Sequence, residues 1–207
     1  QSRAVCFNPS GNKLAVGGSR LLVGEQGIKI ISISNSDNRD QNASVLYWLK
    51  GSSPDHGWPH GGPGPSVWSG VFSGIDWSVD GKLIAAAGRN IRFKTWDAIS
   101  GLVKYGSSHF GYRLFVRKEV AKGVSFSPTG EKLMGSSYQN VVIMDSLTGE
   151  KLHRLLGHSG HVNSVAWSPN GKYVVSGGQG VCNDELVTIW DAEKGLEILT
   201  FTGPKRD

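Results

Sequence analysis

Apolar residues along this chain fall in short runs of four to six residues, and glycine, proline or other turn-forming residues bound each run. Runs of this length and spacing are typical of β-strands joined by tight turns. No helical segment is evident. The pattern therefore predicts an all-β chain, and eight of the expected strands cover residues 28–31, 45–49, 91–96, 102–105, 141–144, 151–156, 187–190 and 196–201.

A turn motif recurs four times along the chain. An aromatic residue that ends a strand opens the motif and glycine closes it, in Phe7–Gly11, Trp77–Gly81, Phe126–Gly130 and Trp167–Gly171. Proline in three of the copies presets φ, and the closing glycine is expected to take a positive φ. The closing glycines are separated by 70, 49 and 41 residues. This spacing indicates a repeat interrupted by insertions.

A second signature lies later in each repeat, where a short apolar strand ends in Trp96-Asp97, Met144-Asp145 or Trp190-Asp191, with Ile31-Ser32 as a degraded copy. A turn and an amphipathic run follow it. Each repeat thus contains four expected strands. The single repeat region spans residues 1–207, with units at about 1–50, 68–106, 120–157 and 158–207 and insertions at about 51–67 and 106–119.

These two registered signatures resemble the repeat of the WD40 family of β-propellers. The resemblance covers nearly the whole chain outside the two insertions and is most specific in the last unit, where Gly157-His158 precedes Trp190-Asp191. It implies an all-β propeller with four four-stranded blades in an incomplete ring, because an open stack of blades leaves two apolar faces exposed. The chain is then a fragment of a longer propeller, a part completed by another subunit, or a four-bladed closure.

The resemblance also implies a buried hydrogen-bonded set in the last unit, a structural tetrad of His158, Ser176, Asp184 and Trp190. A buried imidazole and a buried indole N–H are tolerated only when partners are supplied. In the other three units the Ser176 position is occupied by Val16, Ala86 or Gly135. Those blades are therefore expected to depend on apolar packing, and the tetrad is expected to be structural and not catalytic.

Composition narrows the class of protein. The chain has 29 glycines in 207 residues, a net charge of +5 and two cysteines, Cys6 and Cys182. Two cysteines do not make a disulfide framework, and no apolar run approaches the length of a membrane-spanning helix. No signal peptide is evident either. We therefore expect an intracellular protein, cytoplasmic or nuclear, without membrane insertion.

The sequence carries no enzyme signature. It lacks a phosphate-binding loop, a dinucleotide-binding loop and a nucleophile elbow, and its aspartates recur at repeat positions. Asp55, His56 and His60 form only a weak metal pattern within a glycine-rich segment. We expect no catalytic residues, no cofactor, no metal and no small-molecule substrate.

Both insertions follow a fourth strand, and in the WD40 arrangement such connections lie on one face of the propeller, called the top here. The insertion at about 51–67 is rich in glycine and proline, and is either a recognition loop anchored by Trp58 and Trp68 or a flexible spacer. The insertion at about 106–119 interleaves basic and aromatic residues. It is an added β-ribbon with ordinary packing, a site for an acidic protein, or a site for nucleic acid.

Variable loops gathered on one face of a regular scaffold favour a binding surface. The first hypothesis is a non-enzymatic protein-interaction scaffold, a subunit of a multiprotein complex. The alternatives are a subunit that binds RNA or a ribonucleoprotein through residues 106–119, and the sensor propeller of a larger enzyme. The candidate partner-binding residues are Trp58, His109, Phe110, Tyr112, Arg113, Phe115, Arg117 and Lys118.

Overall fold

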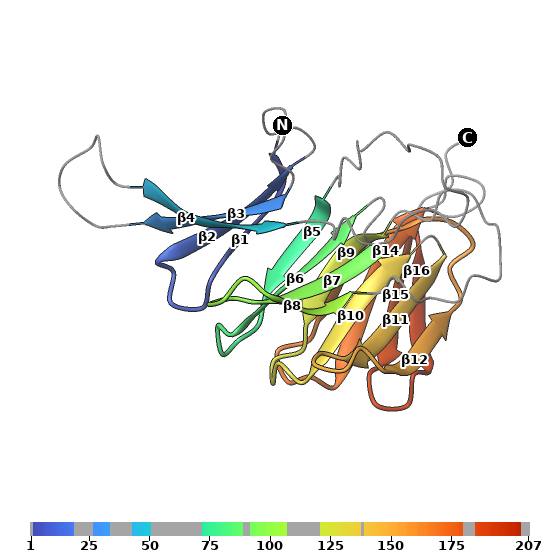
Figure 1. Ribbon diagram of the computed structural model, residues 1–207. Helices are drawn as coiled ribbons and strands as arrows, with labels where there is room; N and C mark the ends of the chain where they lie inside the picture. The colour runs from blue at the N-terminus through green and yellow to red at the C-terminus, as the bar shows by residue number, and fades with distance from the viewer. Residues whose placement is uncertain are drawn as a thin grey trace, which may run out of the picture.

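The described part of the chain contains sixteen β-strands. The computed structural model describes residues 2–18, 27–33, 43–50, 72–88, 92–106, 121–137, 139–179 and 185–203, and these residues contain no helix. The strands form four four-stranded antiparallel sheets, each built from four consecutive strands (Figure 1). The all-β, four-bladed architecture predicted from the sequence is therefore confirmed.

Each sheet is one blade, and its strands are paired in chain order. Blade 1 contains β1 (Ser2–Phe7), β2 (Lys13–Gly18), β3 (Gly27–Ile33) and β4 (Ala43–Lys50). Blade 2 contains β5 (Phe72–Trp77), β6 (Leu83–Gly88), β7 (Arg92–Asp97) and β8 (Val103–Gly106). Blade 3 contains β9 (Ala121–Phe126), β10 (Lys132–Ser137), β11 (Asn140–Asp145) and β12 (Lys151–Leu156). Blade 4 contains β13 (Val162–Trp167), β14 (Tyr173–Gln179), β15 (Glu185–Asp191) and β16 (Glu197–Thr202).

The recurring turns have the backbone geometry that the sequence predicts. The glycines that close the aromatic-to-glycine motif, Gly11, Gly81, Gly130 and Gly171, have φ values of 71°, 73°, 77° and 69°. This left-handed conformation is costly for residues with a side chain, so glycine is the favoured residue at the corner. A second set of positive-φ glycines, Gly101, Gly149 and Gly195, closes the turns between the third and fourth strands.

The aspartate of the Trp-Asp signature shapes the turn that follows it. In blade 3 the Oδ1 atom of Asp145 accepts hydrogen bonds from the backbone N–H groups of Leu147 and Thr148, at 2.9 Å and 2.7 Å. Asp97 and Asp191 accept the corresponding pairs in blades 2 and 4. These hydrogen bonds stabilise the ionised carboxylates and hold the pKa of all three below the usual value for aspartate. These aspartates therefore have a structural role.

Apolar packing between successive blades forms three hydrophobic cores. The core between blades 3 and 4 contains fully buried Met134, Ile143 and Leu155 from blade 3 and Trp190 from blade 4. Equivalent cores lie between blades 1 and 2 and between blades 2 and 3. The innermost strands β1, β5, β9 and β13 pack side by side in this order. Each interior blade thus buries both of its faces.

The ring of blades is open. Blades 1 and 4 lie at opposite ends of the row, and among the described residues each packs against one neighbouring blade (Figure 1). This arrangement confirms the prediction of an incomplete propeller.

Candidate interaction surface

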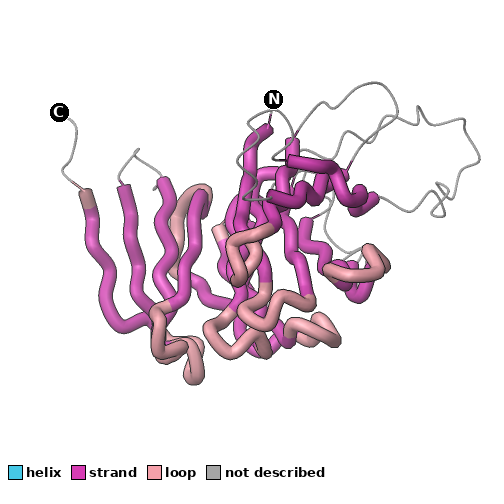
Figure 2. Tube along the Cα trace, turned by 90° about the vertical axis from the view of Figure 1, so that its left-hand side faces the viewer, coloured by secondary structure: helices cyan, strands magenta, loops and turns pink. Residues whose placement is uncertain are grey.

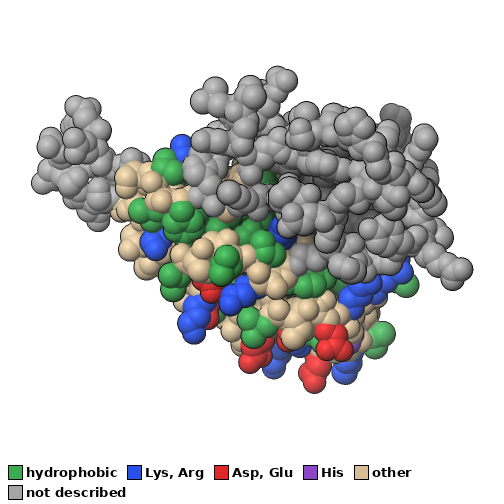
Figure 3. Space-filling view, in the orientation of Figure 1, with side chains coloured by type: hydrophobic (Ala, Val, Ile, Leu, Met, Phe, Trp, Pro, Cys, Tyr) green, Lys and Arg blue, Asp and Glu red, His purple; other side chains and the backbone are tan. Residues whose placement is uncertain are grey.

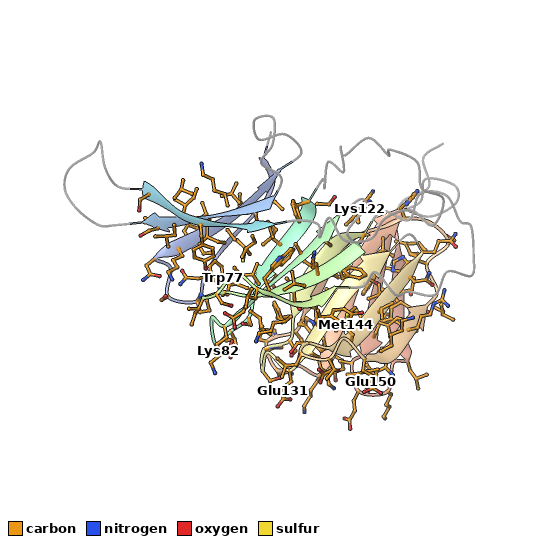
Figure 4. The ribbon with its side chains drawn as sticks, in the orientation of Figure 1. Trp77, Lys82, Lys122, Glu131, Met144 and Glu150 are labelled. Carbon is orange, nitrogen blue, oxygen red and sulfur yellow. The ribbon has the colours of Figure 1, made fainter. Side chains whose placement is uncertain are left out.

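The two ends of the blades differ in the regularity of their connections. At the end called the bottom, every described turn is five residues long, and Figure 2 shows these turns together below the strands. They comprise residues 8–12, 78–82, 98–102, 127–131, 146–150, 168–172 and 192–196. In Figure 4, Lys82, Glu131 and Glu150 lie in these turns, and Lys122 lies toward the opposite end, the top.

The bottom turns present a polar surface with side chains of both charges. Asp80 accepts hydrogen bonds from the Ser78 hydroxyl and the Lys82 backbone N–H, and its carboxylate lies 3.6 Å from the Lys82 Nζ atom. Figure 3 shows basic and acidic side chains next to each other at this end. Exposed ion pairs of this kind contribute little free energy. Two apolar side chains, Ile99 and Leu147, project from the same turns and are 82% and 65% exposed.

The top connections vary in length. The strand ends that bound residues 51–71 and 107–120 all belong to the top, since β4 and β8 end there and β5 and β9 begin there. Both long connections therefore start and finish at the same end of the blades. All eight candidate partner-binding residues, Trp58 and the seven between His109 and Lys118, fall outside the described residues. Their role as partner contacts stays a prediction.

Polar contacts join blades 3 and 4 near the top. The Lys122 ammonium, at the start of β9, donates a hydrogen bond of 2.5 Å to the Asn163 side-chain oxygen at the start of β13. The Gln139 amide donates one of 2.7 Å to the Ser159 carbonyl. Sequence reasoning did not single out Asn163, Gln139 or Ser159 for any role. Asn163 is a polar residue near the start of a strand, and Gln139 and Ser159 lie in connections between strands, where polar residues are common.

Three residues of the predicted tetrad form a buried hydrogen-bonded chain in blade 4. The His158 Nε2 atom lies 2.6 Å from the Ser176 Oγ atom, and the Trp190 indole N–H donates to the same oxygen at 2.8 Å. These three side chains are at most 6% exposed. Burial lowers the pKa of His158, although the charge of Glu197 partly opposes this effect. The imidazole is therefore neutral at physiological pH.

The fourth predicted member, Asp184, falls outside the described residues. The His158 Nδ1 atom is buried and has no hydrogen-bond partner among the described residues. A buried polar atom of this kind ordinarily has a partner. The assignment of Asp184, and of the four-residue set as a structural unit, stays a prediction.

Blade 2 shows how a blade without this serine accommodates its tryptophan. Ala86 stands at the register position of Ser176, and Trp96 is fully buried. The Phe72 ring packs against the indole with a centroid distance of 6.4 Å, and the Lys94 Nζ atom lies 5.8 Å from the indole centroid. Aromatic and cation–π contacts thus surround this indole.

A second group of interacting polar side chains lies on the innermost strands of blades 1 and 2. The Asp76 carboxylate on β5 accepts two backbone hydrogen bonds. One comes from the Trp77 N–H at 2.9 Å, and the other comes from the Phe126 N–H of blade 3 at 2.7 Å. The Cys6 thiol on β1 lies 3.6 Å from the same carboxylate. Burial raises the pKa of Asp76, and burial together with the Asp76 charge raises that of Cys6 to about 11.

This group is poorly suited to nucleophilic chemistry. A thiol with a pKa of about 11 is almost fully protonated at neutral pH, and the thiolate is the reactive form. Cys6 packs against the core between blades 1 and 2, and Asp76 is occupied by backbone donors. Cys182, Asp55, His56 and His60 fall outside the described residues.

In the described part of the chain, no three His, Cys, Asp or Glu side chains come together as ligands for a metal ion. No helix in that part is long and apolar enough to cross a membrane.

Comparison with known proteins identifies the repeat. The family model described as "WD domain, G-beta repeat" matches residues 149–191, which run from the turn before β12 to the end of β15. Protein tipD of Dictyostelium discoideum is 32% identical over 116 residues, which are 56% of this chain and 17% of that protein. The intraflagellar transport protein 80 homolog of Rattus norvegicus is 26% identical over 161 residues, 77% of this chain and 17% of that protein.

A third relative, WD repeat-containing protein 1 of Bos taurus, is 32% identical over 83 residues, 38% of this chain and 13% of that protein. The chain thus spans less than a fifth of the length of each of these curated relatives.

Proposed function

We propose that this chain, which belongs to the WD40-repeat family of β-propellers, is a non-enzymatic scaffold that binds other proteins through its top connections as a subunit of a multiprotein complex. The observation that carries the proposal is the contrast between the two ends of the blades. The described bottom turns are uniform, and both long connections join strand ends at the top. A regular scaffold with variation gathered at one end is typical of a recognition surface.

The chemistry of the described residues supports a binding role over a catalytic one. Asp97, Asp145 and Asp191 are engaged by turn N–H groups, and Asp76 is engaged by the Phe126 N–H. The neutral imidazole of His158 is buried against Ser176 and Trp190. These aspartates and His158 therefore stabilise the turns and the blades.

The names of the relatives also support a general platform. The relatives named Protein tipD, intraflagellar transport protein 80 homolog and WD repeat-containing protein 1 each contain a segment similar to this chain. Similar segments thus occur in proteins with different names, as expected of a fold whose function depends on its loops. We propose that residues 106–119, with Tyr112, Arg113 and Arg117, supply the main contacts to an acidic protein surface. Basic and aromatic side chains complement such a surface.

Crosslinking mass spectrometry of the complex tests which end binds. Lysine crosslinkers can react with Lys122 at the top and with Lys82, Lys172 and Lys194 at the bottom. Lys118 belongs to the connection between β8 and β9, whose two ends are at the top. The proposal expects crosslinks to partner proteins from Lys118 and Lys122. Crosslinks confined to the three bottom lysines would refute it.

A matched pair of variants tests the residues. The double variant Arg113→Ala/Arg117→Ala is expected to weaken partner binding at least tenfold, because it removes two charges from the proposed contact. The control double variant Ile99→Ser/Leu147→Ser changes two exposed bottom residues and is expected to bind normally. The reverse result would assign binding to the bottom. Binding that disappears on nuclease treatment would favour the RNA alternative, which no described residue supports.

A further inference from the structure

The hydroxyl of Thr95 on β7 is buried without a hydrogen-bond partner. Thr95 is fully buried, and its Oγ1 atom makes no hydrogen bond with any described residue. Its partners in the strand register are Ala85 on β6 and Tyr105 on β8, and both pack in the apolar core between blades 2 and 3. Thr95 therefore faces the same core. A hydroxyl in such a place destabilises the packed state, because it has lost its hydrogen bond to water.

The other two blade junctions have isoleucine at the position of Thr95. Strand register identifies the equivalent residues by their partners on the outermost strand. The matching pairs are Ile30 with Tyr47, Thr95 with Tyr105, and Ile143 with His153. Ile30 and Ile143 are fully buried, and their side chains contain no polar atom that needs a partner. The unpartnered hydroxyl is therefore specific to the junction between blades 2 and 3.

The outermost strand of blade 2 is also shorter than those of blades 1 and 3. β8 has four residues, whereas β4 has eight and β12 has six. In β4 and β12 a fully buried leucine, Leu49 or Leu155, follows two positions after the residue that is paired with the isoleucine. In blade 2 the same place in the sequence is Ser107, which falls outside the described residues. A serine side chain does not supply the apolar area that a buried leucine contributes.

Among the described residues of β8, Tyr105 is the one whose side chain packs against the core between blades 2 and 3. Its ring lies against the turn of blade 3, where a Cβ atom at Gly149 would overlap it. Val103 is 48% exposed, and the Lys104 ammonium forms an exposed ion pair of 3.7 Å with Asp97, which contributes little free energy. The attachment of β8 to blade 3 thus depends largely on one aromatic side chain.

The inner part of the same junction is held by contacts that do not involve β8. The Asp76 carboxylate on β5 accepts the Phe126 N–H of blade 3 at 2.7 Å. Phe93 on β7 is buried against β10 so closely that a Cβ atom at Gly135 would overlap its ring. These contacts fix the first three strands of blade 2 against blade 3. Separation at this junction is therefore expected to be confined to β8.

We propose that β8 is a detachable strand, which separates from β7 and from blade 3 while the first three strands of blade 2 stay in place. When Tyr105 leaves, water reaches the Thr95 hydroxyl, and the hydroxyl regains the hydrogen bond that it lacks in the packed state. Local opening of this kind occurs where a segment has few buried apolar contacts. Residues 107–120 follow β8 directly, so its detachment moves the point where that connection begins. The proposal concerns packing within the blades and does not depend on what the connections bind.

Native-state hydrogen exchange of the full chain, followed by mass spectrometry, tests the proposal. The backbone amides of β8 are expected to be about tenfold less protected against exchange than those of β12, which also belongs to a blade with a neighbour on each side. The amides of β5 and β6 are expected to be as well protected as those of β9 and β10, because the inner strands stay packed. Equal protection of β8 and β12, or equally low protection of all four strands of blade 2, would overturn the proposal.

Matched variants show whether the Thr95 hydroxyl is responsible. Thr95→Val keeps the size of the side chain and removes only the hydroxyl, so it is expected to raise the protection of β8 by about fivefold or more. The control Thr95→Ser keeps the hydroxyl and is expected not to raise it. The reciprocal change Ile143→Thr introduces a hydroxyl between blades 3 and 4 and is expected to lower the protection of β12 by a similar factor. If Thr95→Val leaves β8 as exchangeable as in the wild type, the hydroxyl does not favour detachment and the proposal is refuted.

Discussion

The carboxylate of Asp76 on β5 accepts the backbone N–H of Phe126 on β9 at 2.7 Å, across the junction between blades 2 and 3. Phe126 lies at the end of the innermost strand of blade 3, where its N–H points away from its own blade. The same carboxylate is approached by the Cys6 thiol of blade 1. A single side chain thus links the innermost strands of three blades.

Replacing Asp76 is expected to change how stability depends on pH. Burial raises the pKa of Asp76 in the native state, so the native state binds this proton more tightly than the unfolded chain. Its contribution to the free energy of unfolding is therefore largest below the unfolded pKa and falls as pH rises through the native value. Asp76→Asn is expected to remove this pH-dependent decrease in the free energy of unfolding.

Urea unfolding of both proteins between pH 3.5 and 7 measures the effect as a difference. The free-energy difference between wild type and Asp76→Asn should shift against the wild type as pH rises. A difference that does not vary with pH would contradict the pKa assignment. Loss of the Phe126 hydrogen bond itself is probed by Asp76→Ala, with an expected cost of about 1–3 kcal/mol.

Removing the shared hydroxyl in blade 4 should destabilise the fold. Ser176→Ala leaves the His158 imidazole and the Trp190 indole N–H without their common partner in a buried site. The expected cost in the free energy of unfolding is about 1–3 kcal/mol, measured by urea denaturation. The control Ser164→Ala lies on an exposed position of the same blade and should change stability by less than about 0.5 kcal/mol. Equal effects of the two variants would show that the buried hydroxyl has no special role.

A comparison of two glycines with the same φ distinguishes two ways in which an alanine can destabilise a turn: through the positive φ and through contact of its Cβ atom with a neighbour. Gly11 and Gly149 both have φ of +71°, but a Cβ atom at Gly11 meets nothing within 4 Å, whereas one at Gly149 overlaps Tyr105. Gly11→Ala is expected to cost about 1 kcal/mol from the left-handed conformation alone. Gly149→Ala should cost more, by about 1–3 kcal/mol.

Thermal unfolding of the two alanine variants and of the double variant Gly149→Ala/Tyr105→Ala checks this prediction. The double variant should recover part of the extra loss caused by Gly149→Ala, because the overlapping ring is absent. If both single variants lose the same stability, the Tyr105 contact does not restrict position 149.

The turn aspartates should contribute stability with the opposite pH dependence from Asp76. Backbone N–H donors lower the pKa of Asp145 in the native state. Its contribution is therefore present above the unfolded pKa and is lost as pH falls through the lower native value. Asp145→Ala should lower the free energy of unfolding relative to wild type at pH 6. This difference between the two proteins should be smaller at pH 2.5, as measured by urea unfolding at both pH values. The exposed Glu150→Ala, in the same turn, serves as the control.

Local sequence patterns account well for the elements of this fold. The aromatic-to-glycine motif marked the ends of β1, β5, β9 and β13, and the positive φ expected at Gly11 and its equivalents is present. The expected strands agree with the observed ones to within about two residues, as in 151–156 for β12. These features depend on residues close together in the chain, whose alternation and turn chemistry act locally.

Contacts between blades were mostly not predictable. The Asp76–Phe126 hydrogen bond joins residues 50 positions apart, and no motif contains both. Tyr47, Tyr105 and His153 occupy one structural position, yet their types differ and a bulge shifts the register next to each of them. Ser176 and Trp190 were paired from the family resemblance, because no local rule brings an indole to a hydroxyl on the neighbouring strand.

The sequence by itself determined that this protein is a series of four-stranded β units with tight glycine corners, because strand length, alternation and turn conformation are set by neighbouring residues. Only the tertiary structure decided which side chains meet between the units, including the seating of Tyr105 on Gly149 and the burial of Thr95. Packing against a neighbouring blade depends on the shape of both faces at once, and that shape exists only after the blades are stacked.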